Sequence, residues 1–188
     1  MELGRPLDAH QVESFETFGW WLANEAMISG GIGPREVERI DTRHLADSLI
    51  FAHFVTNPDV IWDLGSGVGL PGVPLAILFT ETRFVLIDRS SRRIDLVNRA
   101  VRMLRLENVE VKLADITKLD GEVGVIISRA SLPPSQLIGP VNAHLRPGGI
   151  AIVGGSWQAP PMVDGWVTEE VRLDALDRPV WFLMMRQQ

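Results

Sequence analysis

Hydrophobic side chains recur every three or four positions in the N-terminal third of the chain, which is the spacing of a helix with one buried face. Residues 12–28 follow this pattern, and the glycine-rich stretch at 30–34 ends it. A short helical turn is predicted over 35–40. A third helical segment is predicted to begin near Asp41 or Thr42, because either residue can cap a helix. Residues 1–57 are therefore predicted to form a helical extension.

From residue 58 to the C-terminus, short apolar segments alternate with helical patterns. Strands are predicted over 60–64, 84–88, 109–113, 123–130 and 150–155. Helices are predicted over 70–79, 90–106 and 134–145, and a turn over 146–149. This alternation is typical of a parallel sheet that is covered on both faces. The segments 165–173 and 179–187 have no helix between them, so we expect them to pair antiparallel.

The predicted fold class is α/β: a doubly wound, Rossmann-like sheet that is mostly parallel and ends in a C-terminal antiparallel β-hairpin. A length of 188 residues fits one domain. We expect a single domain over 1–188, with the helical extension at 1–57 and the Rossmann-like core at 58–188.

The composition excludes several classes of protein. Without cysteine the chain has no disulfides, thiol catalysis or cysteine-ligated metals, and its four scattered histidines form no metal-binding pattern. The first ten residues lack the pattern of a signal peptide, and the apolar runs are too short for a membrane span. We therefore expect a cytoplasmic protein without a membrane partner. The net charge of −6 excludes a globally basic nucleic-acid binder but allows a local basic surface.

The string DLGSGVGLPGVPLAI at 63–77 places an acid before a glycine-rich turn and an apolar helix. Gly67, Gly69 and Gly72 have the spacing of the dinucleotide fingerprint, and the helix N-terminus behind them attracts an anion. A pyrophosphate or a carboxylate could be that anion. Asp63 would repel a pyrophosphate but could accept hydrogen bonds from an ammonium group, and two prolines remove N–H donors from the helix entry. These features favour a zwitterionic amino-acid ligand over a dinucleotide.

Two further acids follow the next strands. Asp88 ends the second predicted strand, where a carboxylate can bind both hydroxyls of a ribose. Asp115 follows the third strand, where it could accept a hydrogen bond from the exocyclic amine of an adenine. Each acid alone could instead cap a helix or fix a turn. Three acids after successive strands, beside one glycine turn, favour a shared ligand site.

The glycine turn with Asp63, Asp88 and Asp115 resembles the cofactor site of class I S-adenosylmethionine (SAM) methyltransferases. The longer string DLGSGVGLPGVPLAI resembles the signature of the family that methylates N7 of a guanine in small-subunit (16S) rRNA, also called glucose-inhibited division protein B. RHLADSL at 43–49 and ISRA at 127–130 resemble two further segments of that family. The resemblance implies SAM as the cofactor, and small-subunit rRNA or the assembling small ribosomal subunit as the partner.

The resemblance also implies site residues. Arg129 would be the catalytic residue beside both cofactor and substrate, with a salt bridge that pins the fourth strand as the alternative. The implied cofactor-binding residues are Asp63, Gly65, Ser66, Gly67, Gly69, Leu70, Asp88, Asp115, Ile116, Thr117 and Arg129. The chain departs from the family at 27–31, where Asn-Leu-Thr is usual. It also has Val153 and Gly154 where the family usually carries a lysine.

Guanine N7 carries no proton at neutral pH, so its methylation depends on alignment rather than on a general base. His44 and Asp47 lie one helical turn apart, and they either face the site or serve packing and capping. The helix at 90–106 presents a basic face that could contact RNA phosphates, with an ordinary solvated face as the alternative. The arginines on and around it are Arg89, Arg92, Arg93, Arg99, Arg102 and Arg105.

Other functions stay open on the sequence. The chain could be a SAM-dependent methyltransferase of another RNA or of a small metabolite, or a non-catalytic SAM-binding protein attached to the ribosome. A dinucleotide oxidoreductase comes last. Four tryptophans, Trp20, Trp21, Trp157 and Trp166, have rings that could stack on bases, but their spacing assigns none of them. We expect a monomer.

Overall fold

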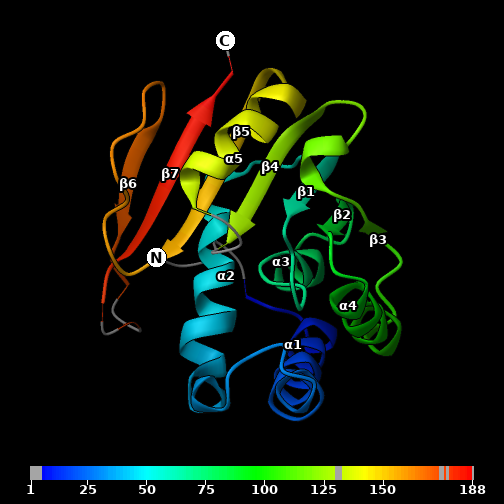
Figure 1. The fold of residues 1–188 in the computed structure, drawn as a ribbon. Helices are drawn as coiled ribbons and strands as arrows, with labels where there is room; N and C mark the ends of the chain where they lie inside the picture. Colours follow the sequence, from blue (N-terminus) through cyan, green and yellow to red (C-terminus); the bar gives the residue numbers. More distant parts are fainter. Residues whose placement is uncertain (1–5, 130–132, 174–175, 177, 188) are drawn as a thin grey trace.

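The computed structural model describes residues 6–129, 133–173, 176 and 178–187, so Ala130, at the end of the predicted strand 123–130, lies outside them. A seven-stranded sheet with the order β3-β2-β1-β4-β5-β7-β6 runs through the molecule (Figure 1). Strands β1 to β5 pair in parallel, and β7 pairs antiparallel with β5 and β6. The predicted α/β fold class is confirmed. The strands are β1 (Val60–Leu64), β2 (Arg83–Asp88), β3 (Val109–Leu113), β4 (Val123–Arg129), β5 (Leu145–Ser156), β6 (Val167–Val171) and β7 (Val180–Arg186).

Each predicted helix is present. The N-terminal helix α1 is fixed at its start by Asp8, whose side chain accepts the Gln11 N–H while the Gln11 side chain accepts the Asp8 N–H, a reciprocal cap. A π-helical segment over Leu22–Ala26 continues α1. The α-helices are α1 (Ala9–Trp21), α2 (Ala46–Ile50), α3 (Gly72–Leu78), α4 (Ser91–Leu104) and α5 (Pro134–His144), and a 3-10 turn spans Ile116–Lys118.

The third helical segment starts earlier than predicted. A 3-10 helix over Pro34–Arg39 passes directly into a π-helical segment over Ile40–Leu45 and then into α2. Asp41 and Thr42 therefore lie inside helical backbone, and the prediction that one of them caps a helix is wrong. Pro34 opens the run, where its fixed φ and missing N–H are tolerated.

The fifth strand also starts earlier than predicted. β5 begins at Leu145, because its pairing with β4 passes from Val123↔Leu145 to Val125↔Ile150. The predicted turn over 146–149 is therefore wrong, and these residues form a bulge within the strand. Sequence pattern suggested a turn because the bulge uses the same residues, Pro and Gly, that turns use.

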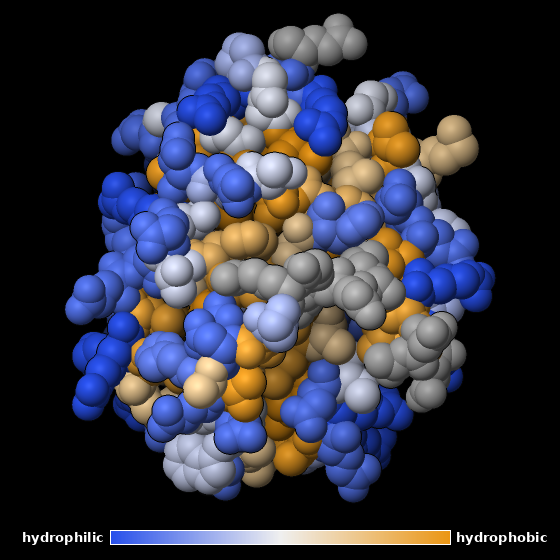
Figure 2. Space-filling view, turned by 180° about the vertical axis from the view of Figure 1, so that it is seen from behind, coloured by the Kyte–Doolittle hydropathy of each residue, from blue (hydrophilic) through white to orange (hydrophobic). Residues whose placement is uncertain are grey.

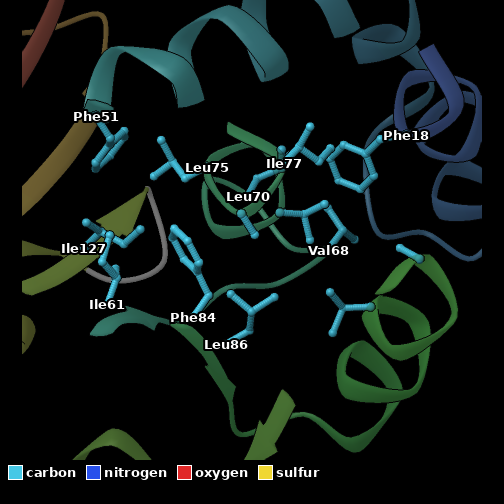
Figure 3. Packing of buried hydrophobic residues seen from close by; sticks show 14 of the residues in the cluster. Phe18, Phe51, Ile61, Val68, Leu70, Leu75, Ile77, Phe84, Leu86 and Ile127 are labelled. Atoms are coloured by element: carbon cyan, nitrogen blue, oxygen red, sulfur yellow. The ribbon is translucent and has the colours of Figure 1, made fainter. Parts of the chain in front are cut away.

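Alternate residues along the strands enter two different hydrophobic clusters. Phe84 and Leu86 of β2 point to the face covered by α1, α3, α4 and the helical segment 40–55. Figure 3 shows Phe84 and Leu86 side by side on the strand, below Leu70 and the side chains of α3. Val85 and Ile87 point to the other face, where α5 and the 3-10 turn 116–118 cover them. Helices on both faces were predicted, and the more extensive cover lies on the α1 side.

The N-terminal helix belongs to this larger cluster. Phe18 and Trp21 are fully buried, with ring centroids 5.7 Å apart, and Phe18 faces Ile77 of α3 (Figure 3). Gln11 ties α1 to the end of α3, since its Nε2 donates to the carbonyl oxygens of Ile77 and Leu78 at 3.1 and 3.3 Å. We therefore expect the helical extension and the sheet to unfold as one cooperative unit.

The face of the molecule opposite to the view of Figure 1 carries many polar residues. In the space-filling view from behind, hydrophilic residues make up most of the outline, and hydrophobic residues are visible between them toward the middle of this face (Figure 2). None of the helices in the described ranges is long and apolar enough to cross a membrane.

Phe18→Ala should lower the free energy of unfolding by about 3–5 kcal/mol, because it leaves a cavity in the shared cluster. Urea denaturation followed by circular dichroism measures this. Val12→Ala on the same helix is the control, since Val12 is 42% exposed and should change stability by less than about 0.5 kcal/mol. Two separate unfolding transitions in the wild-type protein would contradict the shared core.

Candidate functional site

The predicted site residues follow strands that all end at one edge of the sheet. Because β2, β1, β4 and β5 are neighbours in that order and run parallel, Asp88, Gly65, Arg129 and Ser156 follow one another along this edge (Figure 1). Neighbouring strands lie about 4.8 Å apart. The chain order reverses between β1 and β4, the point at which open α/β sheets bind ligands.

The turn after β1 needs its glycines. Gly65, Gly67 and Gly69 have φ values of 72°, 60° and 90°, the left-handed region that side chains disfavour. A Cβ on Gly69 would lie 2.6 Å from Cγ2 of Val73, so helix α3 could not approach as it does. The N–H groups of Gly65 and Ser66 donate to the Ile87 carbonyl oxygen at 2.8 and 3.0 Å, which ties the turn to β2.

Asp63 lies beneath this turn rather than in an open cleft. Its side chain is fully buried, and Oδ2 accepts the Gly72 N–H at 3.0 Å. Burial raises the pKa of Asp63 to about 7, although the Gly72 N–H and the Arg129 charge oppose that shift. Within the described residues, Asp63 Oδ1 and Ser66 Oγ are buried without a hydrogen-bond partner. Both oxygens are sealed beneath the turn, because Asp63 and Ser66 are almost fully buried.

A cleft of about 380 Å³ opens beside the turn. The structure brings five of the predicted cofactor-binding residues to its wall: Gly65, Asp88, Asp115, Ile116 and Thr117. The wall also includes Arg89, Arg93, Ala114 and Gln136. Gln136 comes from α5, and nothing in the local sequence marked it. Predicted residues that do not line this cleft are Asp63, Ser66, Gly67, Gly69, Leu70 and Arg129.

Asp88 holds two backbone segments at once. Oδ2 accepts the Gly67 N–H at 3.0 Å, and Oδ1 accepts the Ser90 N–H at 2.9 Å. The Arg93 guanidinium lies 3.6 Å from Oδ2. Ser90, not Asp88, is the N-cap of α4. Because an ionised carboxylate can accept about four hydrogen bonds, Asp88 keeps capacity for hydroxyl groups of a ligand in the cleft.

Asp115 caps the 3-10 turn on the far side of the cleft. Its Oδ1 accepts the backbone N–H of Thr117 at 2.9 Å and the Thr117 hydroxyl at 2.8 Å. These two bonds lower the pKa of Asp115, which is therefore charged at neutral pH. A capping role and a ligand-binding role are compatible, since Oδ1 makes both bonds and the carboxylate still lines the cleft.

Arg129 points away from the cleft toward the helical segment 40–50. Its Nη1 donates to the Arg43 carbonyl oxygen at 3.1 Å, and its Nη2 donates to His44 Nδ1 at 3.2 Å. Within the described part of the chain these hydrogen bonds, not an ion pair, hold the guanidinium. A Cβ on Gly155 would lie 2.7 Å from Arg129 Cγ, so the backbone of β5 packs closely against the Arg129 side chain. Burial lowers the pKa of Arg129 to about 10, which leaves it charged.

His44 and Asp47 both join this arrangement. Burial, with the charges of Arg129 and Arg43, lowers the pKa of His44 to about 4, so the ring is neutral at pH 7. Since Nδ1 accepts from Arg129, the proton is on Nε2, which lies 3.5 Å from Glu36 Oε2. Asp47 is buried and accepts from Arg43 Nη1 at 2.8 Å, and burial raises the pKa of Asp47 to about 6. Sequence pattern could not pair Arg129 with His44, because the two residues are far apart in the chain.

The predicted basic face of α4 is divided in the structure. Arg89 and Arg93 line the cleft, whereas the Arg92 guanidinium donates to the Ser29 carbonyl oxygen. Arg99 and Arg102 are exposed further along the helix. No group of three or more His, Asp or Glu side chains in the described ranges could hold a metal ion.

Comparison with known proteins gives consistent matches. The family model described as GidB, rRNA small subunit methyltransferase G, matches residues 11–159. A protein of Nocardioides sp. named ribosomal RNA small subunit methyltransferase G is 36% identical over 160 residues, which cover 80% of this chain and 64% of that protein. The protein of the same name from Paracoccus denitrificans is 34% identical over 155 residues, 80% of either chain. The chain thus spans under two thirds of the Nocardioides relative.

Solved structures agree on the fold. A precorrin-6y C5,15-methyltransferase from Geobacter metallireducens superposes with a TM-score of 0.54 at 14% sequence identity, covering 84% of this chain and 90% of the other. At this identity the likeness concerns the fold alone.

Asp63→Asn should reduce the pH dependence of stability. The folded-state pKa of Asp63, raised from 3.8 to about 7, means that the folded protein binds the proton more tightly than the unfolded chain. Its contribution to stability is therefore present below about pH 4 and lost as pH rises through about 7. One pKa unit corresponds to about 1.4 kcal/mol, so the variant should gain at least about 1 kcal/mol relative to wild type across this range. Urea unfolding of both proteins at several pH values measures this gain. A difference in unfolding free energy between variant and wild type that does not change with pH would contradict the raised pKa of Asp63.

Proposed function

Because the chain belongs to the GidB family, rRNA small subunit methyltransferase G, we propose that it transfers the methyl group of SAM to N7 of a guanine in 16S rRNA. The observation that supports this most strongly is the cleft at the carboxyl edge of the sheet. Asp88 and Asp115 stand on its wall beside the turn that resembles the class I cofactor site. We also propose small-subunit rRNA or the assembling small subunit as the partner, a cytoplasmic location and a monomer.

The residues present fit SAM. A cleft of about 380 Å³ is within the range of sites that enclose small molecules, about 300–1,000 Å³. Asp88 would accept the ribose hydroxyls, and Asp115 with Ile116 and Thr117 would hold the adenine. The left-handed glycine turn, of which Gly65 lines the cleft, supports the proposal that the amino-acid end lies there. When bound, SAM supplies a methyl group activated by its positive sulfur.

The chain then has to align an acceptor. N7 of guanine has a free lone pair and no proton to remove, so the reaction needs a fixed geometry and a suitable field instead of a general base. Arg129 is the proposed catalytic residue. Because its guanidinium points away from the cofactor cleft, it would act through its positive charge and not by direct contact with the cofactor. Its charge is fixed by the Arg43 carbonyl oxygen and the neutral His44 ring, so it would not swing away or donate a proton at neutral pH.

The missing family lysine has a structural explanation. Gly154 packs on Phe182, and a Cβ there would lie 2.2 Å from that ring. Val153 is buried in the sheet between β4 and β7. Neither position can carry a lysine toward the substrate in this fold. This departure supports the second candidate function, a SAM-dependent methyltransferase of another RNA or of a small metabolite.

Methyl transfer from radiolabelled SAM is the direct test of the proposed function. We predict label in 16S rRNA when assembled small subunits or protein-free rRNA are supplied, with the methyl group on guanine N7. Small metabolites should acquire none. Label in a metabolite while rRNA stays unlabelled would contradict the proposal and favour the second candidate.

Asp88→Ala should weaken SAM binding by about 1–3 kcal/mol, because ribose hydroxyls would lose their acceptor. Isothermal titration calorimetry with SAM and with its product S-adenosylhomocysteine (SAH) measures the loss. Asp59→Ala is the matched control, since Asp59 is exposed and precedes β1 at the opposite edge of the sheet. NAD should not bind wild type. Unchanged SAM affinity in Asp88→Ala would remove Asp88 from the site.

A further inference from the structure

A second pocket at the carboxyl edge is built from arginines around one tryptophan. The guanidinium carbons of Arg43, Arg178 and Arg39 lie 4.1, 5.0 and 5.9 Å from the centre of the Trp157 ring. These side chains line a pocket of about 170 Å³. The three arginines come from the helical segment 34–45 and from the chain just before β7, so the pocket exists only in the folded protein.

This pocket lies on the far side of Arg129 from the proposed cofactor cleft. Trp157 directly follows β5, which is the neighbour of β4, and Gly65 follows β1 on the other side of β4. Arg43 links the two parts, because its Nη1 donates to the Gly155 carbonyl oxygen at 3.2 Å and its own carbonyl oxygen accepts from Arg129. A ligand in the pocket would therefore be adjacent to the side on which an acceptor would meet the methyl donor.

The charges of the pocket favour an anion. Three guanidinium groups gather on one ring, and Asp47, the one carboxylate among the lining residues that the structure describes, is buried and already bound to Arg43. Arg39 and Arg178 are exposed and form no ion pair with described residues. Asp47 compensates the charge of Arg43, so a further anion in the pocket would lower the repulsion that remains among the three guanidinium groups.

The geometry selects a phosphate group. The ring attracts each guanidinium through its face. Arg43 Nη1 already donates to Asp47 and Gly155. The N–H edges of the exposed Arg39 and Arg178 are therefore the ones suited to the two-point contacts that arginine makes with phosphate. A volume of about 170 Å³ is smaller than sites that enclose a whole small molecule, about 300 Å³ or more. The pocket therefore suits a phosphodiester with part of its sugar and is too small to enclose a nucleotide.

We propose that the pocket formed by Arg39, Arg43, Arg178 and Trp157 binds a backbone phosphate of single-stranded RNA next to the acceptor nucleotide. The proposal rests on the proposed function for its choice of RNA as the source of the phosphate. It also places an RNA contact beside β5, in addition to the one expected on the arginines of α4.

The test compares two double variants. Arg39→Gln/Arg178→Gln removes the two exposed arginines and spares Arg43, whose loss would leave the buried Asp47 carboxylate unpaired. Arg83→Gln/Arg186→Gln is the control: it also removes two positive charges, from exposed residues at the start of β2 and the end of β7, the opposite edge of the sheet. Fluorescence anisotropy of a fluorescein-labelled single-stranded RNA over a salt series gives the affinity.

We expect the pocket variant to bind the RNA about tenfold more weakly. The slope of log affinity against log salt should fall by about 0.7 for each phosphate that the protein no longer neutralises. The control should bind as wild type does. SAM affinity, measured by calorimetry, should be unchanged in both. Trp157→Leu keeps all charges and should also weaken RNA binding, because the ring no longer holds the guanidinium groups. Equal losses in the pocket variant and the control, or wild-type binding by the pocket variant or by Trp157→Leu, would overturn the proposal.

Two further arms separate the alternatives. Inorganic phosphate is titrated into each protein at matched ionic strength. If the pocket variant no longer binds phosphate but still binds RNA as wild type does, the pocket is a site for free phosphate and the RNA assignment is overturned. Methyl transfer to small subunits is measured for the same proteins. RNA binding through the pocket without methyl transfer would sink the proposed function alone. Methylation by the pocket variant at the wild-type rate, with undiminished RNA binding, would sink the pocket proposal alone.

Discussion

Two buried carboxylates bind the backbone of the turn between β1 and α3 from opposite ends. Asp63 accepts the Gly72 N–H, at the start of α3, and Asp88 accepts the Gly67 N–H, within the turn. These two carboxylates, together with the Ile87 and Ser66 carbonyl oxygens, accept the N–H groups of a turn whose three glycines lie in the left-handed region. The wall of the cleft follows from this arrangement, since Asp88 belongs to both the turn and the cleft.

Arg129 divides the carboxyl edge into two sides. Its guanidinium is held by the helical segment that carries Arg43 and His44, and Gly155 of β5 allows its stem to lie flat against the strand. On one side lies the cleft proposed for SAM, and on the other lies the pocket of arginines around Trp157. A methyltransferase needs donor and acceptor held at close distance. The cleft on one side of the fixed Arg129 guanidinium and the Trp157 pocket on the other side are compatible with that need.

Much of the fold could be predicted from local pattern, and the site only in part. Strand alternation and the glycine turn are local features, so the sheet, its hairpin and the position of Asp88 and Asp115 after their strands were accessible from sequence. The bulge at 146–149 was missed because Pro and Gly also mark turns. The predicted short turn over 35–40 is present as a 3-10 helix, but its direct continuation into the next helical segment was missed, because π-helical backbone has no clear sequence signal. Gln136 and Trp157 reach the site through contacts between distant segments, which no spacing rule encodes.

A crystal structure of the chain with SAH would show whether the carboxyl edge binds the methyl donor on the β1–β2 side of Arg129. The account predicts the ribose hydroxyls on Asp88, the adenine beside Asp115 and Thr117, and the amino-acid end at the glycine turn. The Trp157 pocket should stay clear of the ligand. Density for SAH among the arginines around Trp157, or an adenine outside the cleft lined by Asp88 and Asp115, would contradict it.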